Sequence, residues 1–475
     1  MEAKIDIKKL KQQKLKEMLK KKQQPFRVYV DEDSPWLFRD ESTCIRCGKC
    51  KDVCKDKAQI WDTYEIDKTH KHVCIGCGKC VINCPTGALL EKAHYRDVLN
   101  EIENYDKTLV VSVAPGVRVS IAEEFGFAAG LNDEGRLISA LRMVGFDYVF
   151  DITFGADLTI VEEACELIER KTKNVNLPQF SSCCPAWVNF VEIYKPHLTK
   201  NLSTTKSPIS MHGAILKTYF AKQKNLNPEN IVHVVVAPCI AKKSEVSRTG
   251  ISASESYHNI ENLKDVDYVI TTKELAHMIK KLNIPYGNLP EGKFDKMLSR
   301  GSGAGMIFGN TGGVTQAVLR EVYYQITGEN PPTDLLHFEK LRGLEDVKEE
   351  TLTVGDYTFK IAVCNGIANA KKLLTLIENN EKIYDFVEVM TCEGGCIAGP
   401  GQSKQMPLTD ELRQKRIKSL YDSDEQSKIR LAHENPEIRD LYFNFLGKPL
   451  SLLSKKLLHT SYLDRSKEFK LKEIK

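Results

Sequence analysis

The spacing of the cysteines constrains this chain more than any other feature. Eight of the 15 cysteines lie between Cys44 and Cys84, in two runs that share the spacing C-x2-C-x2-C-x3-C. Three thiolates on one tight loop can hold three corners of an iron–sulfur cubane, so the fourth ligand has to come from elsewhere in the fold. Zinc is the alternative, but zinc sites usually take one C-x2-C pair from each half-site. The runs therefore predict iron–sulfur clusters.

The repeat also predicts which cysteines act together. Two-cluster bacterial ferredoxins use this run, and in them the fourth cysteine of each run binds the cluster of the other run. We therefore expect two [4Fe–4S] clusters with crossed ligand sets. The first cluster would be held by Cys44, Cys47, Cys50 and Cys84. The second cluster would be held by Cys54, Cys74, Cys77 and Cys80. Such a unit transfers single electrons.

Charge and hydropathy exclude several classes of protein. The net charge is +4, but residues 1–24 alone carry nine lysines against three acidic residues, which leaves the rest of the chain at −2. This balance argues against a nucleic-acid-binding body, which needs a clustered basic face. The longest apolar runs, such as 231–238, are far shorter than the ~20 residues of a membrane span. Because the N-terminus also lacks a signal-peptide pattern, we expect a cytoplasmic protein without a membrane span.

Changes in composition divide the chain into four segments. We expect a basic N-terminal arm over 1–32 and an α+β, ferredoxin-like domain with two [4Fe–4S] clusters over 33–95. A large domain would cover 105–404, and a helical C-terminal segment would cover 405–475.

The large domain has the pattern of an α/β fold. β-Branched runs alternate with helical patterns, which predicts sheets flanked by helices, with strands buried on both faces. The runs are 109–115, 231–239, 267–271, 360–366 and 386–392. Several of them end directly in unusual motifs, and ligand crevices of open α/β sheets lie beyond the carboxyl ends of the strands.

Five cysteines stand in these motifs. Cys183 and Cys184 are adjacent in SSCCPAW, Cys239 lies in APCIAKKSE, and Cys392 and Cys396 lie in TCEGGCIAGPG. Four thiols that converge at the ligand edge would complete a third [4Fe–4S] cluster and leave one thiol over. Of the remaining cysteines, Cys165 and Cys364 are expected to pack as small apolar residues.

With these three motifs in order, the chain resembles the [FeFe]-hydrogenase, or iron-only hydrogenase, family. The resemblance runs from about residue 33 to 465 and includes HENPEIRDLYFNFLG and LLHTSY near the C-terminus. It implies a six-iron H-cluster, in which Cys396 also bridges the cubane to a diiron unit with CO, cyanide and azadithiolate ligands. The cubane ligands implied by the resemblance are Cys184, Cys239, Cys392 and Cys396.

The resemblance also implies a pocket around the diiron unit. Lys242 matches a donor toward one cyanide, since a point cation suits an anionic diatomic ligand. Cys183 matches the cysteine that exchanges protons with the azadithiolate amine; a thiol whose pKa nearby groups move toward neutrality would suit this relay. The remaining pocket residues would be Ala114, Pro115, Pro238, Phe308, Gly309 and Met390.

A route for protons can be derived from helical spacing. Glu163, Glu166 and Arg170 stand at i, i+3 and i+7, so they share one helix face. A solvated charged edge is the alternative interpretation of such a face. The family has acidic relay residues, an outer arginine and, at Ser203, a relay hydroxyl at matching positions. We therefore expect protons to pass through Glu166, Ser203 and Glu163 to Cys183.

Four positions depart from the family pattern. Ala237 stands where the family usually has Met, Ile209 where it often has Gln, Pro400 where it has Gly, and Gly116 where it often has Ser or Ala. We expect these changes to cluster around the diiron unit and to alter the pocket, while the ligands stay in place.

The resemblance thus implies reversible formation of H2 from protons and electrons, with ferredoxin or a similar soluble carrier as electron partner. Dedicated maturation proteins would have to install the diiron unit. Two other functions stay open, a low-turnover hydrogen sensor and a non-enzymatic, hydrogenase-like iron–sulfur protein.

Overall fold

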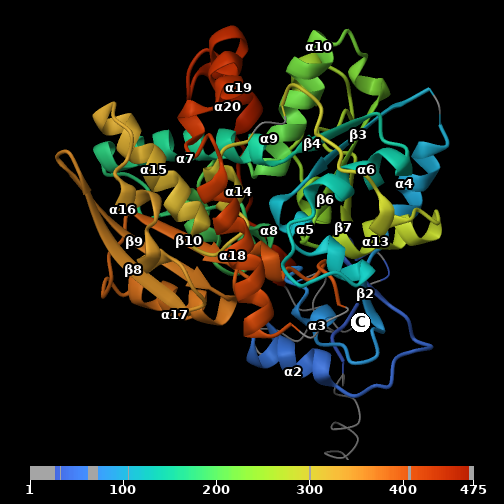
Figure 1. Cartoon of the computed structure of the whole chain (residues 1–475). Helices are drawn as coiled ribbons and strands as arrows, with labels where there is room; N and C mark the ends of the chain where they lie inside the picture. Colours follow the sequence, from blue (N-terminus) through green and yellow to red (C-terminus); the bar gives the residue numbers. More distant parts are fainter. Residues whose placement is uncertain are drawn as a thin grey trace, which may run out of the picture.

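The computed structural model describes residues 27–30, 32, 34–61, 73–104, 106–298, 301–404 and 408–469. Most of the predicted basic arm, residues 1–26, lies outside these ranges. Two sheets lie side by side with helices around them, and the cysteine-rich unit lies below both in Figure 1. None of the helices that the structure describes is both long enough and apolar enough to cross a bilayer.

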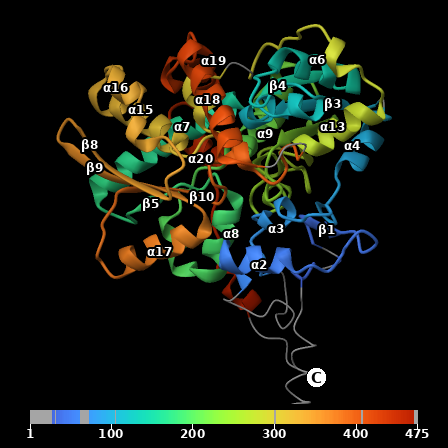
Figure 2. The ribbon, with the colours of Figure 1, turned by 60° about the horizontal axis from the view of Figure 1, so that its bottom comes forward.

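The cysteine-rich unit is a small α+β structure. Its two strands, β1 (Leu37–Arg39) and β2 (Leu89–Glu91), pair antiparallel, and its two short helices pack on each other. The helices are α2 (Lys49–Asp56) and α3 (Lys79–Ile82), and each begins after a glycine in the left-handed region. Figure 2 shows α2 and α3 against the lower face of the large domain. The predicted α+β ferredoxin-like unit is confirmed.

The first sheet of the large domain is entirely parallel, with the strand order β4-β3-β6-β7. Its strands are β3 (Thr108–Val113), β4 (Tyr148–Asp151), β6 (Ile231–Ala237) and β7 (Tyr268–Thr271). Helices cover both faces, as the β-branched runs predict. One face carries α4 (Tyr95–Ile102), α6 (Glu134–Val144) and α13 (Thr272–Lys281); the other carries α7 (Thr153–Lys173) and α9 (Pro208–Ile215).

The second sheet is mixed, with the order β5-β10-β9-β8. Its strands are β5 (Gln179–Phe180), β8 (Val347–Val354), β9 (Tyr357–Asn365) and β10 (Phe386–Met390). β10 is buried along its whole length, as its apolar run predicts, whereas β8, which none of the predicted runs covers, pairs antiparallel with β9 as a partly exposed edge. Alternating burial makes β8 too polar to stand out as a β-branched run.

The chain between and after these strands is mainly helical. The longer helices are α8 (Pro185–Tyr194), α15 (Gly313–Thr327), α17 (Ile367–Glu378) and α18 (Asp410–Gln426). The shorter ones are α5 (Pro115–Arg118), α10 (Ala221–Gln223), α11 (Lys242–Glu245), α12 (Ala253–His258), α14 (Gly303–Ile307), α16 (Thr333–Leu336), α19 (Pro436–Leu441) and α20 (Leu452–Leu458).

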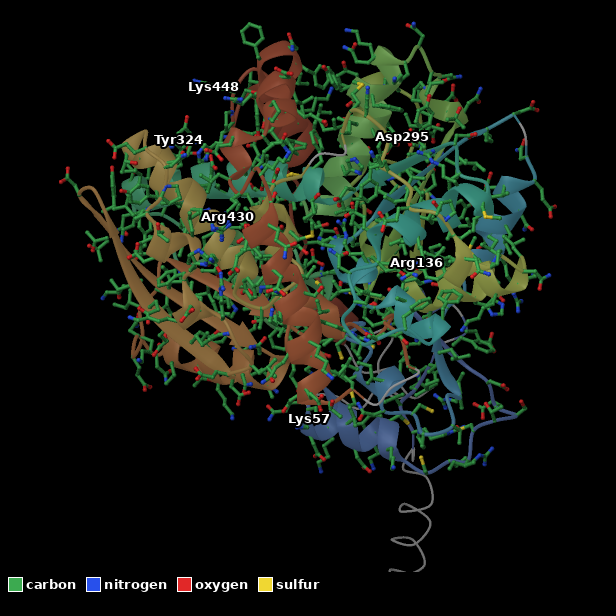
Figure 3. The ribbon with its side chains drawn as sticks, viewed as in Figure 1. Lys57, Arg136, Asp295, Tyr324, Arg430 and Lys448 are labelled. Atoms are coloured by element: carbon green, nitrogen blue, oxygen red, sulfur yellow. The ribbon has the colours of Figure 1, made fainter. Side chains whose placement is uncertain are left out.

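A buried charge cluster ties the C-terminal segment to the large domain. Asp424 of α18 accepts hydrogen bonds from Arg320 of α15 at 2.8 Å and from Arg430 at 2.7 Å. Figure 3 shows Arg430 beside α18, and its side chain is partly exposed. Since Asp424 and Arg320 are almost fully buried, loss of either partner would leave an uncompensated buried charge.

Candidate active site

The cysteines predicted for the first cluster surround one small pocket near the protein surface. Cys44, Cys47, Cys50 and Cys84 all line it, so the structure brings the fourth cysteine of the second run to the first loop. Cys47 is exposed, and Arg27 Nη1 donates to Cys44 Sγ at 3.3 Å. This contact with a cation lowers the pKa of the Cys44 thiol.

The cysteines predicted for the second cluster lie deeper. Burial raises the pKa of the Cys54 and Cys80 thiols well above its usual value, and the nearby Cys74 and Cys77 add to this rise. Cys54 of the first run therefore lies among three cysteines of the second run. The crossed grouping is what the spacing predicts; the role of these residues as ligands stays a prediction.

A third group of thiols gathers where strands of both sheets end. Cys239 follows β6, Cys392 follows β10, and Cys184 caps the N-terminus of α8. Burial raises the pKa of Cys239 to about 12, and the neighbouring thiols of Cys184 and Cys396 contribute to the rise. Cys392 has the same neighbours. Among the described residues, no three Cys, His, Asp or Glu side chains are close enough to share a single metal ion.

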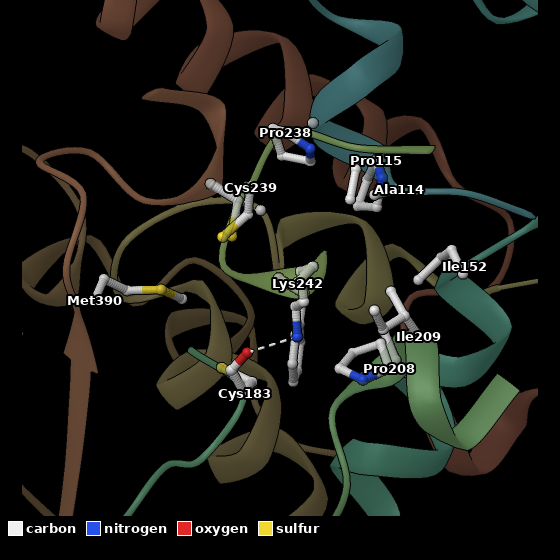
Figure 4. Close-up of a pocket in the computed structure, with 16 residues that line it drawn as sticks. Ala114, Pro115, Ile152, Cys183, Pro208, Ile209, Pro238, Cys239, Lys242 and Met390 are labelled. Carbon is white, nitrogen blue, oxygen red and sulfur yellow. Dashed lines mark hydrogen bonds between the residues drawn. The ribbon is translucent and has the colours of Figure 1, made fainter. Parts of the chain in front are cut away.

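An apolar cavity opens beside this third group. It has an empty volume of about 580 Å³ and an almost wholly apolar wall. Figure 4 shows Cys239, Lys242 and Cys183 around it, with Ala114 and Pro115 on the opposite side from Met390. Every pocket residue implied by the family resemblance lines this cavity, including Pro238, Phe308, Gly309 and Cys396.

Three further lining residues were missed by the sequence analysis. Ile152 follows β4, a strand that the sequence analysis did not identify, and Ala156 lies in the first turn of α7. Pro208 begins α9 next to Ile209. The one available signal was the Ser-Pro pair at 207–208, which predicts a helix start because proline is preferred in the first turn.

The departures from the family pattern do not all belong to this pocket. Gly116, Ile209 and Ala237 line it, as expected. The expectation is wrong for Pro400, whose ring lies instead against Gly78 of the cysteine-rich unit; a Cβ on Gly78 would come within 2.5 Å of that ring. Gly78 also has a φ of 67°, so the contact between the two domains requires glycine there.

Lys242 is a buried cation at the edge of the cavity. Its Nζ donates to Glu245 Oε2 at 2.6 Å and to the Cys183 carbonyl oxygen at 3.0 Å, shown as a dashed line in Figure 4. Burial would lower the pKa of Lys242, but the Glu245 carboxylate raises it above its usual value. The ammonium therefore stays charged, and among the described residues its third proton has no acceptor.

The Cys183 thiol lines the cavity, and Glu163 and Lys242 are among the charged groups near it. The expectation that nearby groups move its pKa toward neutrality is wrong. Burial raises the pKa of Cys183 well above its usual value, and Glu163 adds to the rise more than Lys242 opposes it. Cys183 is therefore held as a thiol, which can donate a proton and be reprotonated but does not persist as a thiolate.

The predicted proton route lies along α7. Ser203 Oγ donates to Glu166 Oε2 at 2.8 Å, and Arg170 Nη2 donates to Glu166 Oε1 at 2.7 Å. Both oxygens of Glu163 are buried without a hydrogen-bond partner. Burial and the adjacent Glu166 carboxylate raise the pKa of Glu163 to about 8, and Ser203 offsets part of that rise. The face is therefore buried, and the alternative of a solvated charged edge is wrong.

Comparison with known proteins identifies the family. The profile described as iron only hydrogenase large subunit, C-terminal domain, matches residues 107–400. The chain belongs to the iron-only hydrogenase family. The iron hydrogenase small subunit profile matches residues 410–465, and the 4Fe-4S dicluster domain profile matches residues 37–85. The family predicted from the cysteine motifs is thus confirmed.

Relatives match over most of the chain. The NADP-reducing hydrogenase subunit HndD of Solidesulfovibrio fructosivorans is 41% identical over 92% of this chain and 76% of that protein. Iron hydrogenase 1 of Clostridium pasteurianum is 38% identical over 91% of this chain and 77% of its own length. A structure of a variant of apo [FeFe]-hydrogenase HydA1 from Chlamydomonas reinhardtii matches with a TM-score of 0.69 and 38% identity, over 78% of this chain and 99% of that one.

The family also extends to proteins with another role. The cytosolic Fe-S cluster assembly factor narfl of Danio rerio is 30% identical over 75% of this chain and 86% of that protein. Membership of the family therefore does not by itself establish hydrogen chemistry, and the residues of the site have to carry that argument.

Proposed function

We propose that this protein is an [FeFe]-hydrogenase that interconverts protons and electrons with H2. The observation that carries the proposal is Cys183. Its thiol faces an apolar cavity bordered by Cys239 and Cys396. Its charged neighbour Glu163 is a buried carboxyl group on the same helix as Glu166, which lines a surface pocket. A buried thiol that connects a proton-carrying helix to a cavity has no evident use in a purely structural iron–sulfur protein.

The residues present suit the cofactors that the family implies. The thiols of the three groups are the soft donors that iron–sulfur clusters need. Cys184, Cys239, Cys392 and Cys396 would hold the catalytic cubane, with Cys396 also next to the diiron unit. The H-cluster, when bound, supplies the metal centre at which electrons and protons combine. The apolar wall would exclude water from this centre, and Lys242 would direct its free proton toward an anionic ligand.

Two routes would then meet at the cavity. Electrons would enter at the exposed Cys47 and pass from the outer group of thiols through the inner group to the third. Protons would pass through Glu166, Ser203 and Glu163 to the Cys183 thiol. Ferredoxin or a similar carrier would dock on the ferredoxin-like domain, and dedicated maturation proteins would install the diiron unit. The cytoplasmic location stays a prediction.

Infrared and activity measurements on protein matured with the hydrogenase maturation proteins test this proposal. We expect sharp CO and cyanide bands and hydrogen evolution with a reduced carrier. Absence of the bands would favour the role of an iron–sulfur protein without a diiron unit. Bands without appreciable turnover would favour a hydrogen sensor.

Substitution of the thiol isolates its role. Cys183→Ala should abolish turnover, because no other group on this side of the cavity connects it to Glu163, while the iron content and infrared bands stay as in the unaltered protein. Cys165→Ala is the matched control, since Cys165 lies on α7 away from the cavity and its loss should leave turnover unchanged. Undiminished hydrogen evolution by Cys183→Ala would contradict the assignment.

A further inference from the structure

A second chain of hydrogen bonds leaves Glu166 and runs outward to the C-terminal segment. Thr204 Oγ1 donates to Glu166 Oε1 at 3.0 Å, and the Nδ1 atom of His459 lies 2.7 Å from the same hydroxyl. On the far side of the ring, His459 Nε2 lies 3.0 Å from Glu162 Oε2. One imidazole therefore joins two glutamates of α7 through contacts at both of its nitrogens.

The partners of Glu162 determine whether His459 Nε2 carries a proton. The Glu162 carboxylate accepts from Tyr442 Oη at 2.5 Å, from the Leu450 amide at 3.0 Å and from the Ser454 hydroxyl. Burial alone would raise the pKa of Glu162, but its hydrogen bonds from His459, Ser454 and Tyr442 hold it below its usual value. Because an ionised carboxylate can only accept, Nε2 has to bear a proton.

The partners of Thr204 determine whether His459 Nδ1 carries a proton. A threonine hydroxyl has one proton, and Thr204 gives it to Glu166, which also receives the charged Arg170. The hydroxyl can then only accept from Nδ1, so this nitrogen has to bear a proton as well. The hydrogen bonds are thus satisfied together only when His459 is an imidazolium ion.

Solvent can reach this chain. Glu166, Thr204 and His459 line an open polar pocket on the surface. The other charged groups in its wall are Arg170 and Lys173 of α7, Glu169 of α7 and Lys455 of α20. Arg170 is paired with Glu166 and Lys173 with Glu169, whereas His459 is joined to Glu166 through the Thr204 hydroxyl.

We propose that His459 is the proton donor at the outer end of the proton route, acting on Glu166 through the Thr204 hydroxyl; this inference rests on the proposed function. The imidazolium gives its Nδ1 proton to Thr204 Oγ1, and the hydroxyl passes its own proton to the Glu166 carboxylate. His459 is left neutral with its Nε2 proton still held by Glu162, and a proton from solvent in the open pocket has to return to Nδ1, the ring nitrogen that gave one up. No redox change accompanies the transfer.

The pH profile of hydrogen evolution tests the role of His459. In His459→Gln, kcat should fall about tenfold at acid pH, less than the 10²–10⁴-fold of a lost catalytic acid, because solvent can still protonate Glu166 slowly. The difference from the unaltered protein should shrink as the pH rises, because a neutral imidazole has no Nδ1 proton to give to Thr204. His433→Gln is the matched control: His433 is another C-terminal histidine paired with a buried glutamate, Glu321, but it lies off the route.

Substitution at Thr204 separates proton transfer from folding. Thr204→Val removes only the hydroxyl and should reproduce the pH profile of His459→Gln, whereas Thr204→Ser should retain the wild-type profile. Equal profiles for the unaltered protein, His459→Gln and Thr204→Val would overturn the inference. If the unaltered protein itself evolves no hydrogen, the proposed function fails instead.

A measurement that needs no activity tests the charge directly. In protein labelled with 15N-histidine and assembled without the diiron unit, the signal lost in His459→Gln should have the shifts of an imidazolium ion at neutral pH. A neutral imidazole there would overturn the inference even if hydrogen evolution is observed.

Discussion

Glu163 and Glu166 are one turn apart on α7 and nearly equally buried, yet their surroundings are opposite. Glu166 accepts hydrogen bonds from Arg170, Ser203 and the backbone and side chain of Thr204. Glu163 has none on either carboxylate oxygen, and its pKa is raised to about 8. One position is built for a carboxylate ion and the next for a carboxyl group that holds a proton.

This difference between the two glutamates gives the proton route along α7 an outer end at Glu166 and an inner end at Glu163. A proton that reaches Glu166 has to leave a charge-stabilised site, whereas Glu163 accepts and keeps a proton near neutral pH. A group with a pKa close to the working pH is best suited to pass a proton in either direction. This asymmetry supports a route from the surface pocket to the Cys183 thiol.

The largest expected effect is on turnover. Glu163→Gln should lower kcat by about 10²–10⁴-fold, because no other titratable group in the part of the chain that the structure describes connects Ser203 to Cys183. Glu166→Gln should have a smaller effect, about 10–10²-fold, since Glu166 is the end of the route that lines the open surface pocket. Hydrogen evolution with reduced carrier measures both. Glu169→Gln on the same helix is the control, because its partly exposed pair with Lys173 contributes little. Equal losses of turnover in Glu163→Gln and Glu166→Gln would contradict the proposed difference between the two glutamates.

A second effect is on stability and depends on pH. With its pKa raised, Glu163 stays protonated in the folded state while the unfolded chain ionises, so it lowers the free energy of unfolding as the pH rises from about 4.5 toward 8. Glu163→Gln removes this loss. The variant should match the unaltered protein near pH 5 and exceed it by about 3–5 kcal/mol above pH 8, as measured by urea unfolding midpoints. A pH-independent difference would show that Glu163 is already ionised.

The smallest expected effect is that of Glu388→Gln, which tests whether a buried glutamate outside the route affects turnover. Glu388 is fully buried, and it accepts from the amides of Gly312 and Thr315 at the start of α15. Glu388→Gln should cost about 1–2 kcal/mol of stability through this lost cap and leave the pH profile of turnover unchanged. Unfolding midpoints and hydrogen evolution check the two parts. A tenfold loss of turnover would place Glu388 on a proton route as well.

Local patterns predicted much of this molecule. The runs at 109–115, 231–239 and 386–392 are strands, and helical spacing correctly placed Glu163, Glu166 and Arg170 on one face. The edge strand β8 was missed because its half-exposed side chains alternate with polar ones. Pro400 was misplaced because no local pattern shows that it packs on Gly78.

The sequence by itself determined the family and the grouping of cysteines, because ligand spacing on a tight loop is a local property. It also determined the order of residues along α7, since helical periodicity is local too. Only the tertiary structure decided the state of each group. Burial and neighbours from distant segments keep Cys183 protonated as a thiol and raise the pKa of Glu163. Folding also places His459 so that the Thr204 hydroxyl joins it to Glu166. Proton affinity depends on the surroundings of a side chain, and these form only when the chain folds.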